Sequence, residues 1–199
     1  MFGLEPSAAA KKSLILLKEK NIKNIAELGA GLGRDTIFFA KNSISVTALD
    51  YSFSAIKIIN QKAEKNNLSN LVTAKVFDIR KKLPFKENSV NLCFSHMLYC
   101  MALTNFDLVN LNREIFRILK PGGINIYTVR HTGDGDYKNG IHIGEDLYEN
   151  DGFIVNFFSK EKIKNLSSGF DILEIEKFEE GNFPRKLFKV TLIKKSLTR

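Results

Sequence analysis

Residues 26–35 read AELGAGLGRD, and the three glycines in this stretch join an apolar run to an amphipathic segment. The run before them, NIAEL at 24–28, predicts a buried strand, and residues 34–41 predict a short helix. Glycine lets the backbone turn tightly between the two and lets a ligand approach closely. In open α/β sheets such a turn lies at the carboxyl edge, where ligands bind.

The same alternation of strand and helix patterns continues outward from this turn, and it predicts a mainly parallel sheet with helices on both faces. The two closing strands have no helix between them, so the last strand must run antiparallel. Pro121-Gly122-Gly123 is expected to end the helix before it, and residues 131–151, rich in Gly, Asp and His, are expected to form a loop. Strands are expected at 45–50, 71–78, 90–95, 124–129, 170–179 and 187–193, and helices at 54–65, 106–120 and 160–166.

Length and composition favour one domain over residues 1–199, with a helical cap at 1–20 and a substrate-side insertion at 131–158. The sequence contains no apolar run of the roughly 18–20 residues that cross a bilayer. It shows no signal peptide at its start and holds two cysteines without a CxxC pair. We therefore expect a cytoplasmic protein with no membrane partner.

The net charge of +8 raises the possibility of a nucleic-acid partner. The lysines are spread along the chain, however, and no aromatic residues interleave with a basic cluster. Spread lysines are typical of a solvated surface. Charge alone therefore does not favour nucleic acid as a partner, and no pattern in the sequence fixes an oligomeric state.

Two cofactors compete for the glycine turn. Dinucleotide sites prefer G-x-G-x-x-G, whereas Gly29, Gly31 and Gly33 are spaced by two and two. Glu27 places a carboxylate at the end of the first strand, where it would repel a pyrophosphate but suit an ammonium group. Asp50, at the end of the second strand, can accept hydrogen bonds from ribose hydroxyls. The pattern favours a cationic, phosphate-free nucleoside over NAD.

At this point the sequence resembles the class I S-adenosylmethionine-dependent methyltransferases, in a small stand-alone subgroup similar to types 11 and 12 and, more distantly, to tellurite-resistance methyltransferases. The resemblance implies an α/β, Rossmann-like seven-stranded sheet whose last strand is antiparallel. It also implies S-adenosylmethionine as cofactor and S-adenosylhomocysteine as product. It is carried by AELGAGLGRD (26–35), VTALD (46–50), FDI (77–79), LPFKENSVNLCFSH (83–96) and REIFRILKPGGINIYTV (113–129).

The resemblance also implies a role for each matching residue of the cofactor site. The glycine turn would contact the amino-acid portion, and Glu27 would hold its ammonium group. Asp50 would bind the ribose and Tyr51 would lie against the adenine. Asp78 would accept the adenine amino group, Ile79 would donate from its backbone, and Ser95 would lie beside the sulfonium. The implied cofactor-binding residues are Glu27, Gly29, Ala30, Gly31, Gly33, Asp50, Tyr51, Asp78, Ile79 and Ser95.

Methyl transfer is an in-line displacement, so it needs alignment and exclusion of water, and a base only where the nucleophile carries a proton. His96 follows the fourth strand and can take a proton, or it can be a hydrogen-bonded loop histidine. Arg130 and His131 follow the fifth strand and can hold an anionic substrate or pair with nearby aspartates. The catalytic candidates are His96, Tyr99, Arg130 and His131. No metal-ligand spacing is present, so no metal is expected.

Three classes of function remain open. The sequence is little longer than the expected sheet requires, which favours a methyltransferase acting on a small molecule. A nucleic-acid methyltransferase is the alternative suggested by the charge, but Ser95-His96-Met97-Leu98 replaces the Asn/Asp-Pro-Pro-Tyr/Phe motif after the fourth strand. The third class is a cofactor-binding module without catalysis.

Overall fold

The computed structural model of the chain describes residues 5–181 and 185–195. One sheet holds seven strands in the order β3-β2-β1-β4-β5-β10-β9. Neighbours among β1 to β5 pair in parallel, and β10 is antiparallel to both β5 and β9. The expected sheet with an antiparallel last strand is confirmed. Its strands are β1 (Asn24–Leu28), β2 (Ser45–Asp50), β3 (Val72–Val76), β4 (Val90–His96), β5 (Leu119–Arg130), β9 (Phe170–Glu180) and β10 (Arg185–Lys194).

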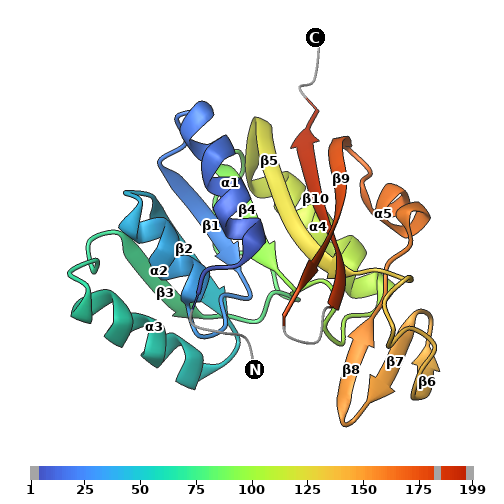
Figure 1. Cartoon of the computed structure of the whole chain (residues 1–199). Coiled ribbons are helices and arrows are strands. Elements are labelled where there is room, and N and C mark those ends of the chain that lie inside the picture. Colours follow the sequence, from blue (N-terminus) through green and yellow to red (C-terminus); the bar gives the residue numbers. More distant parts are fainter. Residues whose placement is uncertain (1–4, 182–184, 196–199) are drawn as a thin grey trace.

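Helices cover both faces of the sheet, each with its own hydrophobic core (Figure 1). One core packs α1, α2 and α3 against the sheet, and the other packs α4 and α5 against the opposite face. Serine or threonine side chains cap the starts of α1, α3, α4 and α5, which satisfies backbone N–H groups there. The helices are α1 (Ala8–Glu19), α2 (Arg34–Lys41), α3 (Phe53–Lys65), α4 (Asn105–Ile118) and α5 (Lys160–Leu166).

Helix α4 ends earlier than the sequence predicts. Thr104 and Asp107 form a capping box at its start, and Leu108, Leu111 and Ile115 form its buried stripe, as expected. The backbone then becomes extended at Leu119, so residues 119–123 belong to β5 rather than to the helix and its turn. A register shift in the β4–β5 pairing accommodates this early start.

The expected loop over residues 131–151 is wrong for its second half. Residues from 141 onward form an antiparallel sheet of β6 (Ile141–Gly144), β7 (Leu147–Asn150) and β8 (Phe153–Asn156), beside the main sheet in Figure 1. Asp151 and Gly152 have φ values of 51° and 80°, the pattern of a two-residue type I′ hairpin turn. The Asp-Gly pair was the sequence signal for this hairpin.

The carboxyl ends of β1, β2, β4, β5 and β9 lie at one edge of the sheet, because these strands run in the same direction. This edge brings together the segments that follow each strand. In residues 5–181 and 185–195, no helix combines the length and the apolar character needed to cross a lipid bilayer.

Candidate cofactor and acceptor site

The glycine turn is built for a close approach of ligand to backbone. Gly33 has a φ of 76° and precedes α2, and a Cβ there would lie 2.6 Å from Ile59 Cγ1. Gly31 has a φ of 52°, but a Cβ there would meet no protein atom within 4 Å. Gly33 is therefore required by packing, whereas Gly31 borders open space in which a ligand can lie against the main chain.

Asp50, at the end of β2, is hydrogen-bonded to the backbone of this turn. Its Oδ2 accepts a hydrogen bond from the Gly31 backbone N–H at 2.8 Å, and its Oδ1 accepts one from the Ser52 N–H at 2.9 Å. Each carboxylate oxygen keeps further acceptor capacity beyond these bonds. The arrangement leaves Asp50 able to accept hydrogen bonds from two hydroxyl groups of a ligand at the edge.

Glu27 is a buried carboxyl group beneath the turn. Its Oε2 accepts a hydrogen bond from the Thr36 hydroxyl at 2.6 Å, and only 3% of the residue is exposed. Burial, with the nearby carboxylates Asp35 and Asp50, raises the pKa of Glu27 from 4.5 to about 8. A cation bound above the turn would reverse this effect, because it favours the charged carboxylate.

Asp78 lies two residues beyond β3, which ends at Val76 rather than at Asp78 as expected. Its carboxylate forms a bidentate pair with Arg80, with contacts of 2.7 to 3.1 Å, and this pair lowers its pKa to about 2. Asp78 is therefore fixed as an anion at the edge. Tyr51 is 80% exposed beside Asp50, whereas the Ile79 side chain is buried in the core.

The end of β4 supplies two polar side chains. Ser95 is buried, and its hydroxyl makes no hydrogen bond within the described ranges. His96 Nδ1 lies 3.0 Å from the Thr128 hydroxyl, which also accepts the Met97 backbone N–H at 2.9 Å. Burial, and then the nearby Arg34, lower the pKa of His96 to about 3, so its ring is neutral at pH 7.

Glu180, at the end of β9, is a site residue that sequence reasoning missed. Its Oε1 accepts a hydrogen bond from Arg34 Nη2 at 2.9 Å, and its Oε2 lies 3.7 Å from His96 Nε2. These three residues come from β9, α2 and β4, so only the tertiary structure joins them. The signal available in the sequence was an acidic residue at the carboxyl end of another parallel strand.

Tyr99, a predicted catalytic candidate, lies inside the core instead. Its side chain is fully buried and stacks on Tyr127, with ring centroids 4.1 Å apart. Its hydroxyl donates to Asn112 Oδ1 at 2.8 Å and accepts from Asn125 Nδ2 at 3.1 Å. Both contacts are internal, so this placement corresponds to a packing role, and Tyr99 does not face the edge of the sheet.

Arg130 and His131 are also engaged within the protein. Arg130 forms ion pairs with Asp134 and Asp136, which is the pairing with nearby aspartates predicted from the sequence as one of its two uses. His131 Nδ1 accepts the Gly133 backbone N–H at 2.8 Å, and its ring packs on Phe188 with centroids 4.6 Å apart. Both side chains help to hold the segment after β5, and their role toward an anionic substrate stays a prediction.

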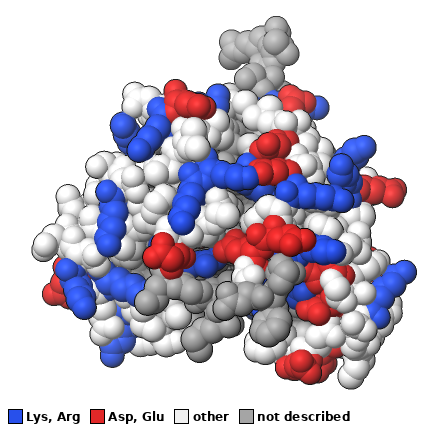
Figure 2. All heavy atoms as spheres, viewed as in Figure 1, with Lys and Arg blue, Asp and Glu red and all other residues white. Residues whose placement is uncertain are grey.

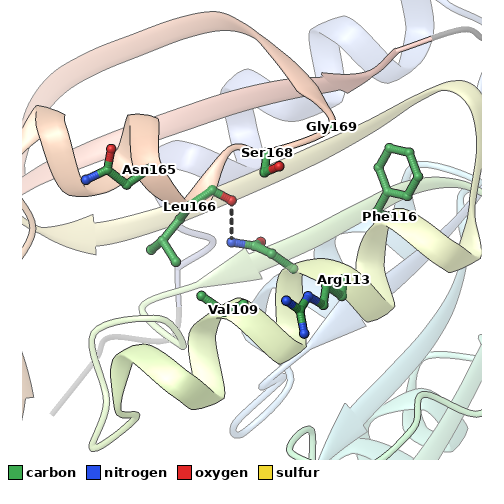
Figure 3. Close-up of a pocket in the computed structure, with 8 residues that line it drawn as sticks. Val109, Arg113, Phe116, Asn165, Leu166, Ser168 and Gly169 are labelled. Carbon is green, nitrogen blue, oxygen red and sulfur yellow. Dashed lines mark hydrogen bonds between the residues drawn. The ribbon is translucent and has the colours of Figure 1, made fainter.

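A separate cavity of about 360 Å³ lies between α4 and α5 (Figure 3). Asn112 donates to the Leu166 carbonyl at 3.0 Å across its floor. The cavity opens near the start of β9, at the edge of the sheet opposite the glycine turn. It is therefore not part of the site. Its lining residues are Val109, Asn112, Arg113, Phe116, Asn165, Leu166, Ser168 and Gly169.

Comparisons with known proteins identify the kind of domain. Residues 25–123 match the family model described as a methyltransferase domain. The chain is 36% identical over 101 residues to phosphoethanolamine N-methyltransferase 1 of Triticum aestivum, an alignment that covers 51% of this chain and 20% of that protein. The chain spans less than half the length of the first curated relatives it matches, namely 20%, 44% and 27% of three of them.

Two solved structures share most of the fold. An S-adenosylmethionine-dependent methyltransferase from Methanosarcina mazei has a TM-score of 0.76 at 20% identity, covering 87% of this chain and 93% of that one. The Burkholderia thailandensis 1,6-didemethyltoxoflavin-N1-methyltransferase, solved with its substrate and S-adenosylhomocysteine, has a TM-score of 0.74 at 17% identity, covering 95% and 79%. Residues 25–123 therefore belong to the methyltransferase-domain family, and the two solved structures show that the chain has the fold of S-adenosylmethionine-dependent methyltransferases.

Proposed function

We propose that this protein transfers a methyl group from S-adenosylmethionine to a small-molecule acceptor. One observation carries the proposal: the buried carboxyl of Glu27 lies beneath an open glycine turn and has the Thr36 hydroxyl as its hydrogen-bond partner. A buried carboxyl without a paired cation is costly to ionise. A ligand with an ammonium and a sulfonium group matches it, and a pyrophosphate does not.

The residues at the edge fit the rest of this cofactor. We assign the amino-acid portion to the turn formed by Gly29, Ala30, Gly31 and Gly33, with its ammonium on Glu27. Asp50 would accept the ribose hydroxyls, and the exposed ring of Tyr51 would lie on the adenine. Asp78 and the Ile79 backbone would bind the adenine edge. The unpartnered Ser95 hydroxyl lies where β4 ends, and we assign it to the neighbourhood of the sulfonium. When bound, the cofactor supplies an activated methyl group.

We infer that the acceptor is a small molecule rather than a nucleic acid. Basic and acidic side chains are interspersed on the face seen in Figure 2, so that face carries no single basic field. Lys12 pairs with Glu176, and Lys189 pairs with Glu174 and Glu176. Lysines paired in this way contribute less to the attraction of a phosphate backbone. Two buried, reduced cysteines support the cytoplasm as the proposed location.

A methyl-release assay tests the proposed function. Purified full chain is incubated with S-adenosylmethionine and a panel of amines, alcohols, thiols and carboxylic acids, and S-adenosylhomocysteine is quantified. We expect turnover with at least one member of the panel and loss of that turnover in Glu27→Ala. A salt-dependent RNA shift assay runs in parallel. RNA-dependent product formation with no turnover of any small molecule would overturn the acceptor class.

A further inference from the structure

Glu180, the last residue of β9, lies between Arg34 and His96 at the edge of the sheet. Arg34 is the first residue of α2, directly after the glycine turn, and His96 is the last residue of β4. The Glu180 side chain lies between them, with 19% of its surface exposed against 16% for Arg34 and 9% for His96. A carboxylate is thus held at the edge of the sheet by Arg34 of α2 and faces His96 of β4.

The two oxygens of Glu180 differ in their contacts. Oε1 accepts the hydrogen bond from Arg34 at 2.9 Å. Oε2 is buried and accepts no hydrogen bond among the described residues, because His96 Nε2 at 3.7 Å is beyond hydrogen-bond length. A buried carboxylate oxygen without a donor is costly, and ligand groups are the usual partners of such atoms in binding sites. Oε2 is therefore an oxygen at this edge of the sheet with acceptor capacity left for a hydrogen of a ligand.

The hydrogen bonds of Thr128 determine which nitrogen of His96 carries the hydrogen. The Thr128 hydroxyl accepts the Met97 N–H, and its own hydrogen needs an acceptor because Thr128 is fully buried. His96 Nδ1, at 3.0 Å, is that acceptor if it is bare. The hydrogen of the neutral ring then sits on Nε2 and points toward Glu180. In this form Nδ1 of His96 accepts the Thr128 hydrogen and Nε2 already carries one. Neither nitrogen can therefore take a proton from a substrate.

We propose that Glu180, and not His96, takes the proton of the methyl acceptor, with Arg34 and His96 positioning its carboxylate. This inference rests on the proposed methyl transfer. A bond forms between the nucleophile and the methyl carbon as the methyl–sulfur bond breaks with its electron pair left on sulfur. The proton of the nucleophile passes to Glu180 Oε2 and then to solvent. The acceptor class is therefore one whose nucleophile carries a hydrogen, an N–H, O–H or S–H group.

The position of the ring hydrogen tests this proposal without knowledge of the acceptor. Long-range ¹H–¹⁵N NMR of the full chain at pH 7, with and without S-adenosylhomocysteine, reports which nitrogen of each histidine is protonated. His131 and His142 serve as internal references, and loss of a signal in His96→Asn gives the assignment. We expect His96 with hydrogen on Nε2. A bare Nε2 would overturn the proposal, because His96 would then be a competent base.

Variants of Glu180 test whether its carboxylate takes the proton of the acceptor. Because the Thr128 hydroxyl donates to Nδ1, the ring hydrogen of His96 should stay on Nε2 in Glu180→Gln as in the wild type. Glu179→Gln makes the same change at the adjacent, exposed residue and should leave His96 unchanged. On any acceptor that the panel identifies, Glu180→Gln should lower kcat by about 10²-fold or more with the KM for S-adenosylmethionine unchanged. An unchanged kcat in Glu180→Gln would contradict the proposal.

Calorimetric titration with S-adenosylhomocysteine distinguishes failure of this inference from failure of the proposed function. Wild type and Glu180→Gln should bind it with the same Kd within about twofold. If the wild type does not bind S-adenosylhomocysteine, the proposed function itself is wrong, whichever nitrogen of His96 carries the hydrogen. If S-adenosylhomocysteine binds normally but Nε2 of His96 carries no hydrogen, only the role proposed for Glu180 is wrong.

Discussion

The carboxylate of Asp50 accepts the backbone N–H of Gly31 at 2.8 Å, so the end of β2 is tied directly to the turn that follows β1. Asp50→Asn replaces one acceptor oxygen with an NH₂ group that faces an N–H donor. We expect a loss of about 1.5–3 kcal/mol in the free energy of unfolding, the range for hydrogen bonds to charged groups. Affinity for S-adenosylhomocysteine should fall at least about tenfold.

Thermal unfolding and calorimetric titration check both effects of this substitution. Asp151→Asn is the matched control, because the Asp151-Gly152 turn has positive φ values that asparagine tolerates well. It should leave stability and affinity unchanged. Equal affinity in Asp50→Asn and wild type would contradict the assignment of Asp50 to the ribose.

The raised pKa of Glu27 predicts an unusual pH dependence for the ligand-free protein. Between the unfolded value of 4.5 and the folded value of about 8, the native state binds a proton that the unfolded state has lost. The contribution of Glu27 to the free energy of unfolding therefore falls as pH rises through this window. Across this window the free energy of unfolding should fall by at least about 1.4 kcal/mol less in Glu27→Gln than in the wild type, because one pKa unit corresponds to that amount. Urea titrations at several pH values measure it, and identical slopes in both proteins would refute the assignment.

Binding of the cofactor should couple to the same proton. A cationic ligand favours the charged form of Glu27, so its binding at pH 7 should release a proton to the buffer. Calorimetry in two buffers of different ionisation enthalpy measures the release. We expect close to one proton for wild type and a clearly smaller value for Glu27→Gln. Proton uptake by wild type would be inconsistent with an ammonium held on Glu27.

Tyr99 is predicted to matter for stability and not for ligand binding. Tyr99→Phe removes the hydroxyl that links Asn112 and Asn125 and leaves two buried amide groups short of a partner. We expect a loss of about 1–3 kcal/mol in the free energy of unfolding. The Kd for S-adenosylhomocysteine should not change. A substantial loss of affinity for S-adenosylhomocysteine with unchanged stability would contradict the packing role of Tyr99.

Lys194 stabilises the end of α4 from the last strand. Its Nζ donates to the Phe116 and Leu119 carbonyls at 2.7 Å each and to Asn88 Oδ1 at 2.8 Å. Lys194→Met should cost about 1.5–3 kcal/mol, because carbonyls at a helix end lose a charged donor. Lys195→Met is the control, since Lys195 is exposed and pairs with Asp171 at the surface, and should change stability by less than about 0.5 kcal/mol. Denaturant midpoints that shift equally would contradict this assignment.

The parts of the fold predicted from the sequence are those that local pattern determines. The glycine turn at 29–33 and the strand–helix alternation fix the parallel part of the sheet, and the absence of a helix between the closing strands fixes β10 as antiparallel. The β6–β8 sheet was missed because its strands are only four residues long, too short for period-two alternation to stand out. The Glu180 contact could not be predicted, since it joins residues nearly 150 positions apart that only sheet order brings together.

Selective binding of the cofactor pair tests the central claim most directly. Calorimetric titration of the purified full chain with S-adenosylhomocysteine and, separately, with NADH compares the two ligands that the glycine turn is expected to distinguish. The account predicts saturable one-to-one binding of the thioether nucleoside, weakened at least about tenfold in Asp50→Asn, and no binding of NADH. Saturable binding of NADH with none of S-adenosylhomocysteine would contradict it.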